Sequence, residues 1–162
     1  MAWEVDRRAL LGTAGVGAVD WLVMRPSPGE ANARYAVAHT PAEWRKLLGA
    51  ERYRILREAG TERPFSSPLN KEHRRGAFAC AGCGLPLFSS AAKFDSGTGW
   101  PSFFAPLPGA VATRTDFKLI VPRTEYHCAR CEGHQGHVFN DGPRPTGKRY
   151  CNNGVALKFV PA

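Results

Sequence analysis

Five cysteines, arranged as two CxxC pairs and one separate residue, constrain this chain more than any other feature. The pairs are Cys80 with Cys83 and Cys128 with Cys131, and the separate residue is Cys151. Four thiolates at this spacing suit a tetrahedral zinc site, and zinc closed by four sulfurs has no open position for a substrate. The sequence therefore predicts a structural Zn²⁺ held by the paired cysteines and leaves Cys151 as a free thiol.

The two CxxC pairs are separated by 44 residues, which is longer than the loop of a small zinc ribbon. We therefore expect strands whose ends are stapled together by the metal. Glycine follows each pair, at Gly84 and Gly133, where a tight turn needs conformational freedom. Disulfides or redox-active CxxC pairs are the competing interpretations, and export from the cytoplasm would favour them. No strand–CxxC–helix pattern indicates a thioredoxin-like site.

Length and composition indicate one domain with many turns. A chain of 162 residues with 43% hydrophobic residues can bury a core. The 17 glycines and 13 prolines favour short strands over long helices. A net charge of +8 would allow contact with nucleic acid or another anionic partner. Because the basic residues are scattered and no run of five occurs, we favour a solvated basic enzyme surface.

The N-terminus has the parts of a cleavable export signal. Arg7 and Arg8 precede a weakly apolar stretch at residues 9–24, and an A-x-A cleavage pattern follows at residues 31–33. The arginine pair resembles the twin-arginine type of signal. Asp20 counts against this interpretation, because a charge inside the apolar region is costly in a membrane. The stretch is too short and interrupted to predict a transmembrane helix.

We therefore expect residues 1–33 to be a twin-arginine signal peptide and residues 34–162 to be a zinc-stapled domain. This organisation predicts a periplasmic or otherwise exported protein that makes no contact with a membrane once the signal is removed. A cytoplasmic protein with an N-terminal extension or helix is the alternative.

The domain is expected to be mostly β, with short helices at its start. Residues 40–43 carry a threonine cap, a proline and a glutamate that completes a capping box. Residues 51–59 form a second helical stretch that ends at a glycine. Short β-like runs, separated by Gly, Pro and Asp clusters, then predict antiparallel strands. These runs are residues 76–80, 85–88, 117–121, 125–128, 137–139 and 155–159.

The residues near Cys151 indicate thiol chemistry. A thiolate is the reactive form of cysteine, and a nearby cation lowers the pKa of the thiol. Alternate residues of a strand share a face, so Arg149 and Asn153 are expected beside the sulfur. His134 and His137 supply imidazoles that could donate protons or hydrogen-bond a polar substrate oxygen.

Residues 93–103 are rich in glycine and aromatic side chains and are the second informative run. The glycines lack the spacing of a phosphate-binding loop, and no lysine follows them. Trp100, held rigid by Pro101, could form an apolar wall for a small methyl-bearing group. Core packing is the alternative, and we favour it for Phe94 and Phe103.

Together these motifs resemble the B-type methionine-R-sulfoxide reductases. The resemblance extends from about residue 40 to residue 159. It implies a tent-like fold of two antiparallel sheets with N-terminal helices and a structural zinc. It also implies thiol-dependent reduction of methionine-R-sulfoxide, in peptides and optionally as the free amino acid. The motifs that carry it are Cys80 to Cys83 and residues 93–103, 134–139, 141–143 and 149–151.

The resemblance also implies roles for single residues. Cys151 matches the family's nucleophile, and Arg149 matches the arginine that assists its thiolate. Trp100 matches the indole that receives the substrate methyl group, and Phe139 is expected to bind substrate beside it. Three polar residues match the surroundings of the sulfoxide oxygen and the proton supply: His134, His137 and Asn153.

The chain departs from the family pattern at several positions. Many members carry a second, resolving cysteine between the CxxC pairs, and residues 84–127 contain none. We therefore expect a one-cysteine cycle, in which Cys151 becomes a sulfenic acid and an external thiol reduces it. Gln135 replaces the apolar residue usual between the histidines, and Asn152 and Gly154 are unusual neighbours of Asn153.

The expected partners are oxidised proteins or peptides and an external reductant such as a thioredoxin-like protein. Nucleic acid is not expected, and the protein is expected to be a monomer. One alternative is a non-catalytic, zinc-stapled β module that binds a protein or RNA. The other is a cysteine hydrolase that uses Cys151, a histidine and Asn153. No strand–turn–helix nucleophile elbow supports the hydrolase.

Overall fold

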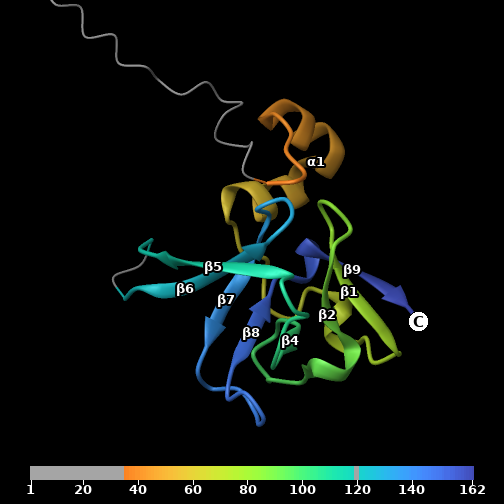
Figure 1. Cartoon of the computed structure of the whole chain (residues 1–162), viewed down its shortest axis with the longest axis vertical. Helices are drawn as coiled ribbons and strands as arrows, with labels where there is room; N and C mark the ends of the chain where they lie inside the picture. Colours follow the sequence, from red (N-terminus) through yellow and green to blue (C-terminus); the bar gives the residue numbers. More distant parts are fainter. Residues whose placement is uncertain (1–34, 119–120) are drawn as a thin grey trace, which may run out of the picture.

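The computed structural model describes residues 35–118 and 121–162, which form a helix and two antiparallel sheets (Figure 1). The signal-peptide prediction for residues 1–33 lies outside the described residues. Within the described part, no helix combines the length and the apolar character needed to cross a bilayer.

Helix α1 (Pro41–Glu58) begins with the predicted capping box. The Thr40 hydroxyl accepts from the Glu43 N–H, and the Glu43 carboxylate accepts from the Thr40 N–H at 2.8 Å. Gly49 has φ 70° and ψ 171°, so it interrupts the helix. The two predicted helical stretches are thus the two segments of one kinked helix.

The strands form two antiparallel sheets, which confirms the predicted fold class. In the smaller sheet, β1 (Gly76–Cys80) lies between β2 (Pro86–Ser89) and β9 (Leu157–Pro161). The larger sheet contains, in spatial order, β3 (Lys93–Phe94), β4 (Ser102–Phe103), β8 (Arg149–Asn152), β7 (His134–Phe139), β6 (Arg123–Cys128) and β5 (Val111–Asp116). Short 3-10 turns are formed by Pro68–Lys71, Ser90–Ala92 and Gly154–Ala156.

Aromatic side chains join the two sheets in the core. Phe103 of the larger sheet stacks on Phe88 with a centroid distance of 4.2 Å and meets Phe78 edge-on at 4.9 Å. Tyr126 contacts Phe88 at 6.0 Å. These four rings are fully buried, so the predicted core role of Phe103 is confirmed. Phe94 is only half-buried.

The strand predicted at residues 117–121 is wrong for residues 117, 118 and 121, and residues 119–120 lie outside the described residues. Strand β5 ends at Asp116, whose carboxylate accepts a hydrogen bond from the Lys118 N–H at 2.9 Å. This local bond turns the backbone away from the ladder. Phe117 is then 74% exposed, so its hydrophobic character misled the prediction.

The sequence pattern missed β5 itself because most of its side chains are exposed and polar. A strand with one solvated face can lack a hydrophobic run. The strand predicted at residues 155–159 starts later than expected. Its first two residues belong to the 3-10 turn Gly154–Ala156, and β9 begins at Leu157.

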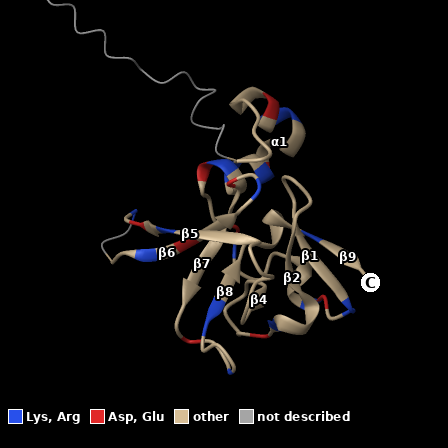
Figure 2. Ribbon diagram, viewed as in Figure 1, with Lys and Arg blue, Asp and Glu red and all other residues tan. Residues whose placement is uncertain are grey.

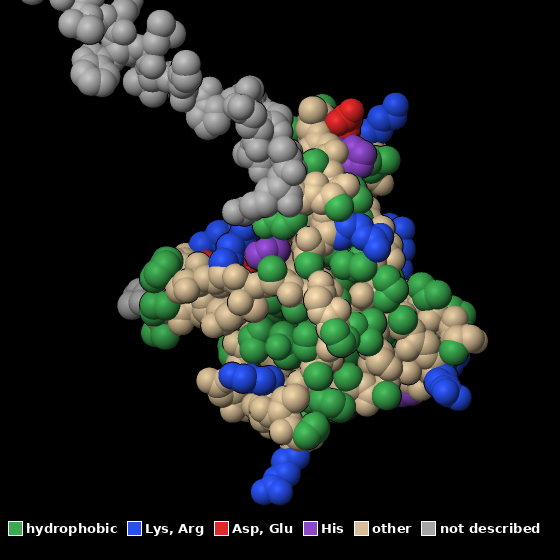
Figure 3. All heavy atoms as spheres, in the orientation of Figure 1, with side chains coloured by type: hydrophobic (Ala, Val, Ile, Leu, Met, Phe, Trp, Pro, Cys, Tyr) green, Lys and Arg blue, Asp and Glu red, His purple; other side chains and the backbone are tan. Residues whose placement is uncertain are grey.

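The basic residues are spread over the surface. Lys and Arg residues occur on α1, on several strands and on loops (Figure 2). On the face drawn in Figure 3 they lie at separate places around the outline. This distribution fits the solvated basic surface expected from the sequence.

Candidate active site and metal centre

The four paired cysteines lie together, with sulfur atoms all within 4.8 Å of one another. The Cys80 and Cys131 sulfurs are 3.7 Å apart, and the Cys83 and Cys128 sulfurs are 3.5 Å apart. A tetrahedral zinc with Zn–S bonds of about 2.3 Å would separate its sulfurs by about 3.8 Å. The residues present therefore fit a four-coordinate metal centre.

The two turns that carry these cysteines have the same backbone shape. In the first turn the left-handed residue is Gly84, with φ 74°, and in the second it is Glu132, with φ 61°. Each of these amides donates to the carbonyl of the first cysteine of its pair. The expectation that Gly133 supplies the turn's freedom is therefore wrong. Gly133 instead lies close to the core, since a Cβ there would be 2.9 Å from Leu56 Cδ2 and that side chain would have to shift.

Crowding of the four thiols changes their acidity. Hydrogen bonds between them raise the pKa of Cys80 and Cys131 and lower the pKa of Cys83 and Cys128. All four cannot ionise together without a cation, because thiolates at this separation repel one another. A soft, tetrahedral, all-sulfur donor set suits zinc.

Cys151 lies outside the metal centre, in the middle of the larger sheet. It is paired with Ser102 of β4 on one side and with His137 of β7 on the other. The neighbouring β7 residue must be glycine, because a Cβ on Gly136 would lie 1.9 Å from the Cys151 carbonyl oxygen. The two strands that carry the site can therefore approach closely.

A cavity of about 130 Å³ opens beside the Cys151 side chain. Its wall is formed by Thr61, Trp100, Arg123, Gly136, His137, Phe139, Cys151, Asn152 and Asn153. Five predicted site residues thus share one cavity. The other two, His134 and Arg149, do not belong to its wall. A larger groove of about 880 Å³ lies between α1 and β9 and contains none of the predicted catalytic residues.

The surroundings of Cys151 act on its acidity in opposite directions. Burial raises the pKa of the thiol, while the charge of Arg149 and hydrogen bonds from Thr98 and Arg149 lower it. Burial outweighs the others, so the net pKa is raised and the resting group at neutral pH is a thiol. The expected influence of Arg149, which lowers the pKa of the thiol, has the right direction, but burial acts more strongly.

Arg149 is held rigidly behind the sulfur. Its Nε and Nη2 atoms donate to the Asp141 carboxylate at 2.9 and 2.8 Å. Its guanidinium lies over the Phe139 ring, 4.3 Å from the centroid. Phe139 therefore both lines the cavity and contacts the Arg149 guanidinium through its ring.

His137 faces the cavity and is oriented by a carboxylate. Its Nε2 lies 2.7 Å from Asp116 Oδ2, which also accepts from Arg123 Nη2 at 2.7 Å. Burial lowers the pKa of His137, and the hydrogen bond to Asp116 opposes this only in part. The imidazole is therefore neutral at pH 7, and its bond to Asp116 assigns the proton to Nε2.

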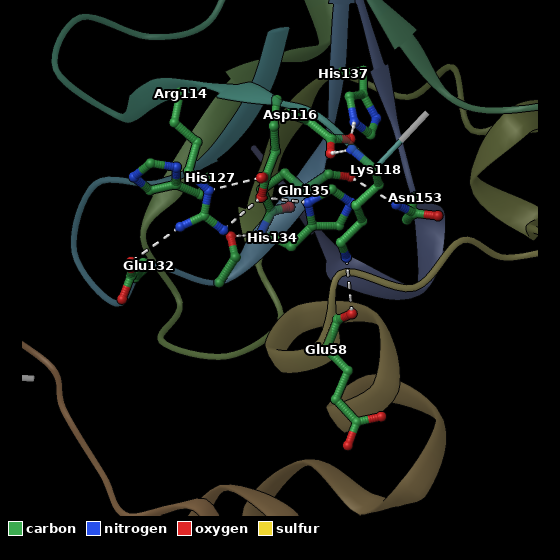
Figure 4. Close-up of polar contacts among 12 residues, drawn as sticks. Glu58, Arg114, Asp116, Lys118, His127, Glu132, His134, Gln135, His137 and Asn153 are labelled. Carbon is green, nitrogen blue, oxygen red and sulfur yellow. Dashed lines mark hydrogen bonds and ion pairs between the residues drawn. The ribbon is translucent and has the colours of Figure 1, made fainter. Parts of the chain in front are cut away.

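His134 is buried and lies three positions before His137 on β7. Its Nδ1 lies 2.7 Å from Glu125, which also accepts from Arg114. Burial raises the pKa of Glu125, but the bonds from His134 and Arg114 outweigh it and bring the pKa to about 2. The two imidazole rings are 5.6 Å apart, and Figure 4 shows His137 pointing toward Asp116.

Asn153 lies just beyond the end of β8 rather than within the strand. Its Oδ1 accepts from the Glu62 N–H at 3.0 Å, and its Nδ2 donates to the Gln135 carbonyl at 3.0 Å. Trp100 Nε1 donates to the Glu62 carbonyl at 3.2 Å. Trp100, predicted to bind substrate, and Asn153, predicted to be catalytic, are therefore both bonded to the backbone of Glu62.

Sequence reasoning missed several residues of this site. Thr98 belongs to the run that was singled out, but only its aromatic residues drew attention. Asp116 and Glu125 could be found only from strand register, because the sequence does not show which residues oppose the histidines. Arg123 and Glu62 lie in segments with no recognised motif.

Comparisons with known proteins agree with this site. A family model described as the SelR domain matches residues 48–161. The chain is 57% identical over 123 residues to peptide methionine sulfoxide reductase MsrB of Thiobacillus denitrificans, covering 75% of this chain and 93% of that protein. The chain belongs to the MsrB family.

Further relatives support the same assignment. MsrB of Leptospira interrogans is 51% identical over 126 residues, which cover 77% of this chain and 96% of that protein. MsrB of Methanosarcina barkeri is 50% identical over 128 residues, which cover 78% of this chain and 90% of that protein. The resemblance to the B-type reductases is therefore confirmed, and MsrB membership favours neither the hydrolase nor the binding module.

Proposed function

We propose that this chain reduces the R epimer of methionine sulfoxide in peptides and proteins, with Cys151 as the nucleophile. The observation that carries the proposal is the position of Cys151, which lines a cavity with Trp100 and His137 while the other cysteines gather elsewhere. The cavity of about 130 Å³ suits the end of a methionine side chain better than a large ligand.

In the proposed step, the Cys151 sulfur attacks the sulfoxide sulfur. This attack joins the two sulfurs transiently; two electrons pass from Cys151 to the substrate, the substrate S–O bond and the transient S–S bond break, and a new S–O bond forms on Cys151. The thiol proton ends on this oxygen, so the products are methionine and a cysteine sulfenic acid. Donors aimed at the oxygen help most in the transition state, where its negative charge is greatest.

The side chains around the cavity supply these interactions. Arg149 and Thr98 stabilise the thiolate form of Cys151, which attacks the substrate. His137 lines the cavity, and its unprotonated Nδ1 can accept a proton during the step, while Asn153 carries a second N–H hydrogen on Nδ2. Trp100 and Phe139 provide the apolar wall for the methyl group.

The remaining predicted residues act from behind the cavity. His134 packs beside His137 and is held by a carboxylate, so it orients and tunes its neighbour. We propose zinc as the metal of the four-cysteine centre, where it would join the end of β1 to the end of β6 and take no part in the reaction. Its ligands would be Cys80, Cys83, Cys128 and Cys131.

Regeneration requires a thiol from outside the chain. All four other cysteines belong to the metal centre. An external thiol would attack the sulfenic acid, release water and form a mixed disulfide, which a second thiol then reduces. A dithiol protein of the thioredoxin-like class has the required chemistry.

We also propose that residues 1–33 direct export of the folded, metal-loaded domain. The arginine pair and the A-x-A pattern support this route. Loading zinc in the cytoplasm would protect the four cysteines from forming disulfides in an oxidising compartment.

One assay tests the proposed activity. A peptide carrying a single methionine sulfoxide is prepared as each epimer and incubated with dithiothreitol and either the wild-type protein or Cys151→Ser. We expect the wild-type protein to reduce only the R epimer and the variant to reduce neither. Reduction of the S epimer, or activity that survives the substitution, would contradict the proposal.

A further inference from the structure

We propose that Glu62 is a positioning residue that fixes Trp100 and Asn153 at the wall of the catalytic cavity. This inference rests on the proposed function, because it explains how the substrate-binding side chains of that reaction keep their geometry.

Glu62 is buried, with 4% of its surface exposed, although it carries a carboxylate. A buried carboxylate must be hydrogen-bonded to persist. Its two oxygens accept from the backbone N–H groups of Gly154 and, at 3.0 Å, Val155. The Glu62 side chain therefore joins its own loop, residues 60–67, to the 3-10 turn that directly follows Asn153.

The backbone N–H and carbonyl of Glu62 hydrogen-bond to two side chains of the site. Its N–H donates to Asn153 Oδ1 at 3.0 Å, and its carbonyl accepts from Trp100 Nε1 at 3.2 Å. Glu62 thus holds both Asn153, just beyond the end of β8, and Trp100, in the glycine-rich run. The preceding residue, Thr61, lines the cavity directly.

The loop around Glu62 has little regular structure to hold it. Residues 60–67 belong to no helix or strand. Close packing limits the loop on one side, because a Cβ on Gly154 would lie 2.0 Å from Ser67 Oγ and 3.3 Å from Glu62 Oε1. Without the carboxylate, we expect the Glu62 carbonyl to shift, so that the Trp100 indole loses its acceptor and rotates.

Two substitutions weaken the Glu62 hydrogen bonds to different extents. Glu62→Gln keeps the shape and one acceptor oxygen but places an NH₂ group against a backbone N–H. Glu62→Ala removes both acceptors. Glu58→Gln is the matched control, because the Glu58 side chain is half-exposed and its carboxylate lies 3.8 Å from Arg45 in a surface ion pair.

The experiment measures steady-state kinetics with the R-sulfoxide peptide and dithiothreitol, together with the indole N–H resonance of Trp100, assigned with Trp100→Phe. Glu62→Gln is expected to raise KM about 10-fold, with a smaller change in kcat, and Glu62→Ala to lower kcat/KM about 100-fold. Both variants should shift the Trp100 resonance, and Glu58→Gln should change neither quantity.

The outcomes separate this inference from the proposed function. A folded Glu62→Gln or Glu62→Ala with wild-type KM and an unmoved Trp100 resonance would overturn the positioning role. A lower melting temperature with the same KM and resonance would show that Glu62 acts on stability alone, which also overturns it. If the wild-type protein reduces no sulfoxide, the proposed function fails, and the Trp100 resonance still tests the position of the indole. If Glu62→Ala does not fold, Glu62→Gln decides.

Discussion

Arg149 and Cys151 lie two positions apart on β8, and the charge of the Arg149 guanidinium acts on the Cys151 thiol while the Asp141 carboxylate holds the guanidinium in place. The cation lowers the pKa of a thiol whose burial raises it. The reactivity of the sulfur therefore depends on a balance between a fixed positive charge and a low-dielectric setting.

Arg149→Met should disturb that balance. Loss of the cation leaves only Thr98 to oppose burial, so the pKa of Cys151 rises further. Alkylation of Cys151 by iodoacetamide at pH 7.5, which requires the thiolate, should therefore slow. Lys158→Met, an exposed substitution on β9, is the control and should react like the wild-type protein. An unchanged alkylation rate in Arg149→Met would show that the guanidinium does not act on the sulfur.

Thr98→Val tests the second donor. Its hydroxyl hydrogen-bonds to Cys151 and also lies 2.8 Å from Ser96 Oγ. Removing it should raise the pKa of Cys151, but less than loss of the guanidinium, since a neutral donor stabilises a thiolate less than a charged one. The pH dependence of alkylation measures both effects. A pKa lowered by Thr98→Val would contradict this role.

The pH dependence of sulfoxide reduction follows from the raised pKa of Cys151. Only the thiolate attacks, and its fraction grows about 10-fold per pH unit below the pKa. We expect single-turnover rates, measured without a reductant, to rise from pH 6.5 to pH 8.5. Omitting the reductant removes its own titration from the result. A rate that is flat over this range would indicate a thiolate already formed at rest.

Gln135→Leu should loosen the metal centre. Gln135 Nε2 lies 3.5 Å from Cys80 Sγ and 3.4 Å from the Gly133 carbonyl, so it donates toward a ligand and steadies the second turn. Loss of such an outer contact costs about 10-fold or more in metal affinity. Transfer of the metal to a coloured chelator measures its release, with Asn140→Leu as an exposed amide control. Equal rates of metal release in Gln135→Leu and the wild-type protein would show that Gln135 does not stabilise the metal centre.

Export gives a prediction for the N-terminus. Replacing Arg7 and Arg8 together by lysine should leave the protein in the cytoplasm of a host with a twin-arginine system, whereas the wild-type protein should appear in the periplasm without residues 1–33. Fractionation and mass spectrometry of the product check both parts. Equal distribution of the two proteins would refute the signal.

Sequence patterns located the parts of this molecule whose chemistry is local. The CxxC spacing predicted the four-cysteine centre, and the capping box predicted the start of α1. The lone Cys151 and the motifs around it predicted the family. Each of these signals is carried by neighbouring residues, so one chain is enough to read it.

Features that depend on burial or on pairing between distant strands could not be predicted. The sign of the Cys151 pKa shift depends on how deeply the sheet buries the sulfur. The bond between Asp116 and His137 depends on two strands that flank a third. Glu62 reaches a turn more than 90 residues away in the chain, and no spacing rule predicts such a contact.

The product left on the enzyme after one turnover tests the central claim most directly. The metal-loaded protein is mixed with an excess of the R-sulfoxide peptide in the absence of any thiol, and each cysteine is examined by mass spectrometry after trapping of sulfenic acids. We predict one methionine formed per protein molecule, with one oxygen gained at Cys151. Oxidation of a CxxC cysteine instead, or a disulfide from Cys151 to one of them, would contradict a single nucleophile that works apart from the metal centre.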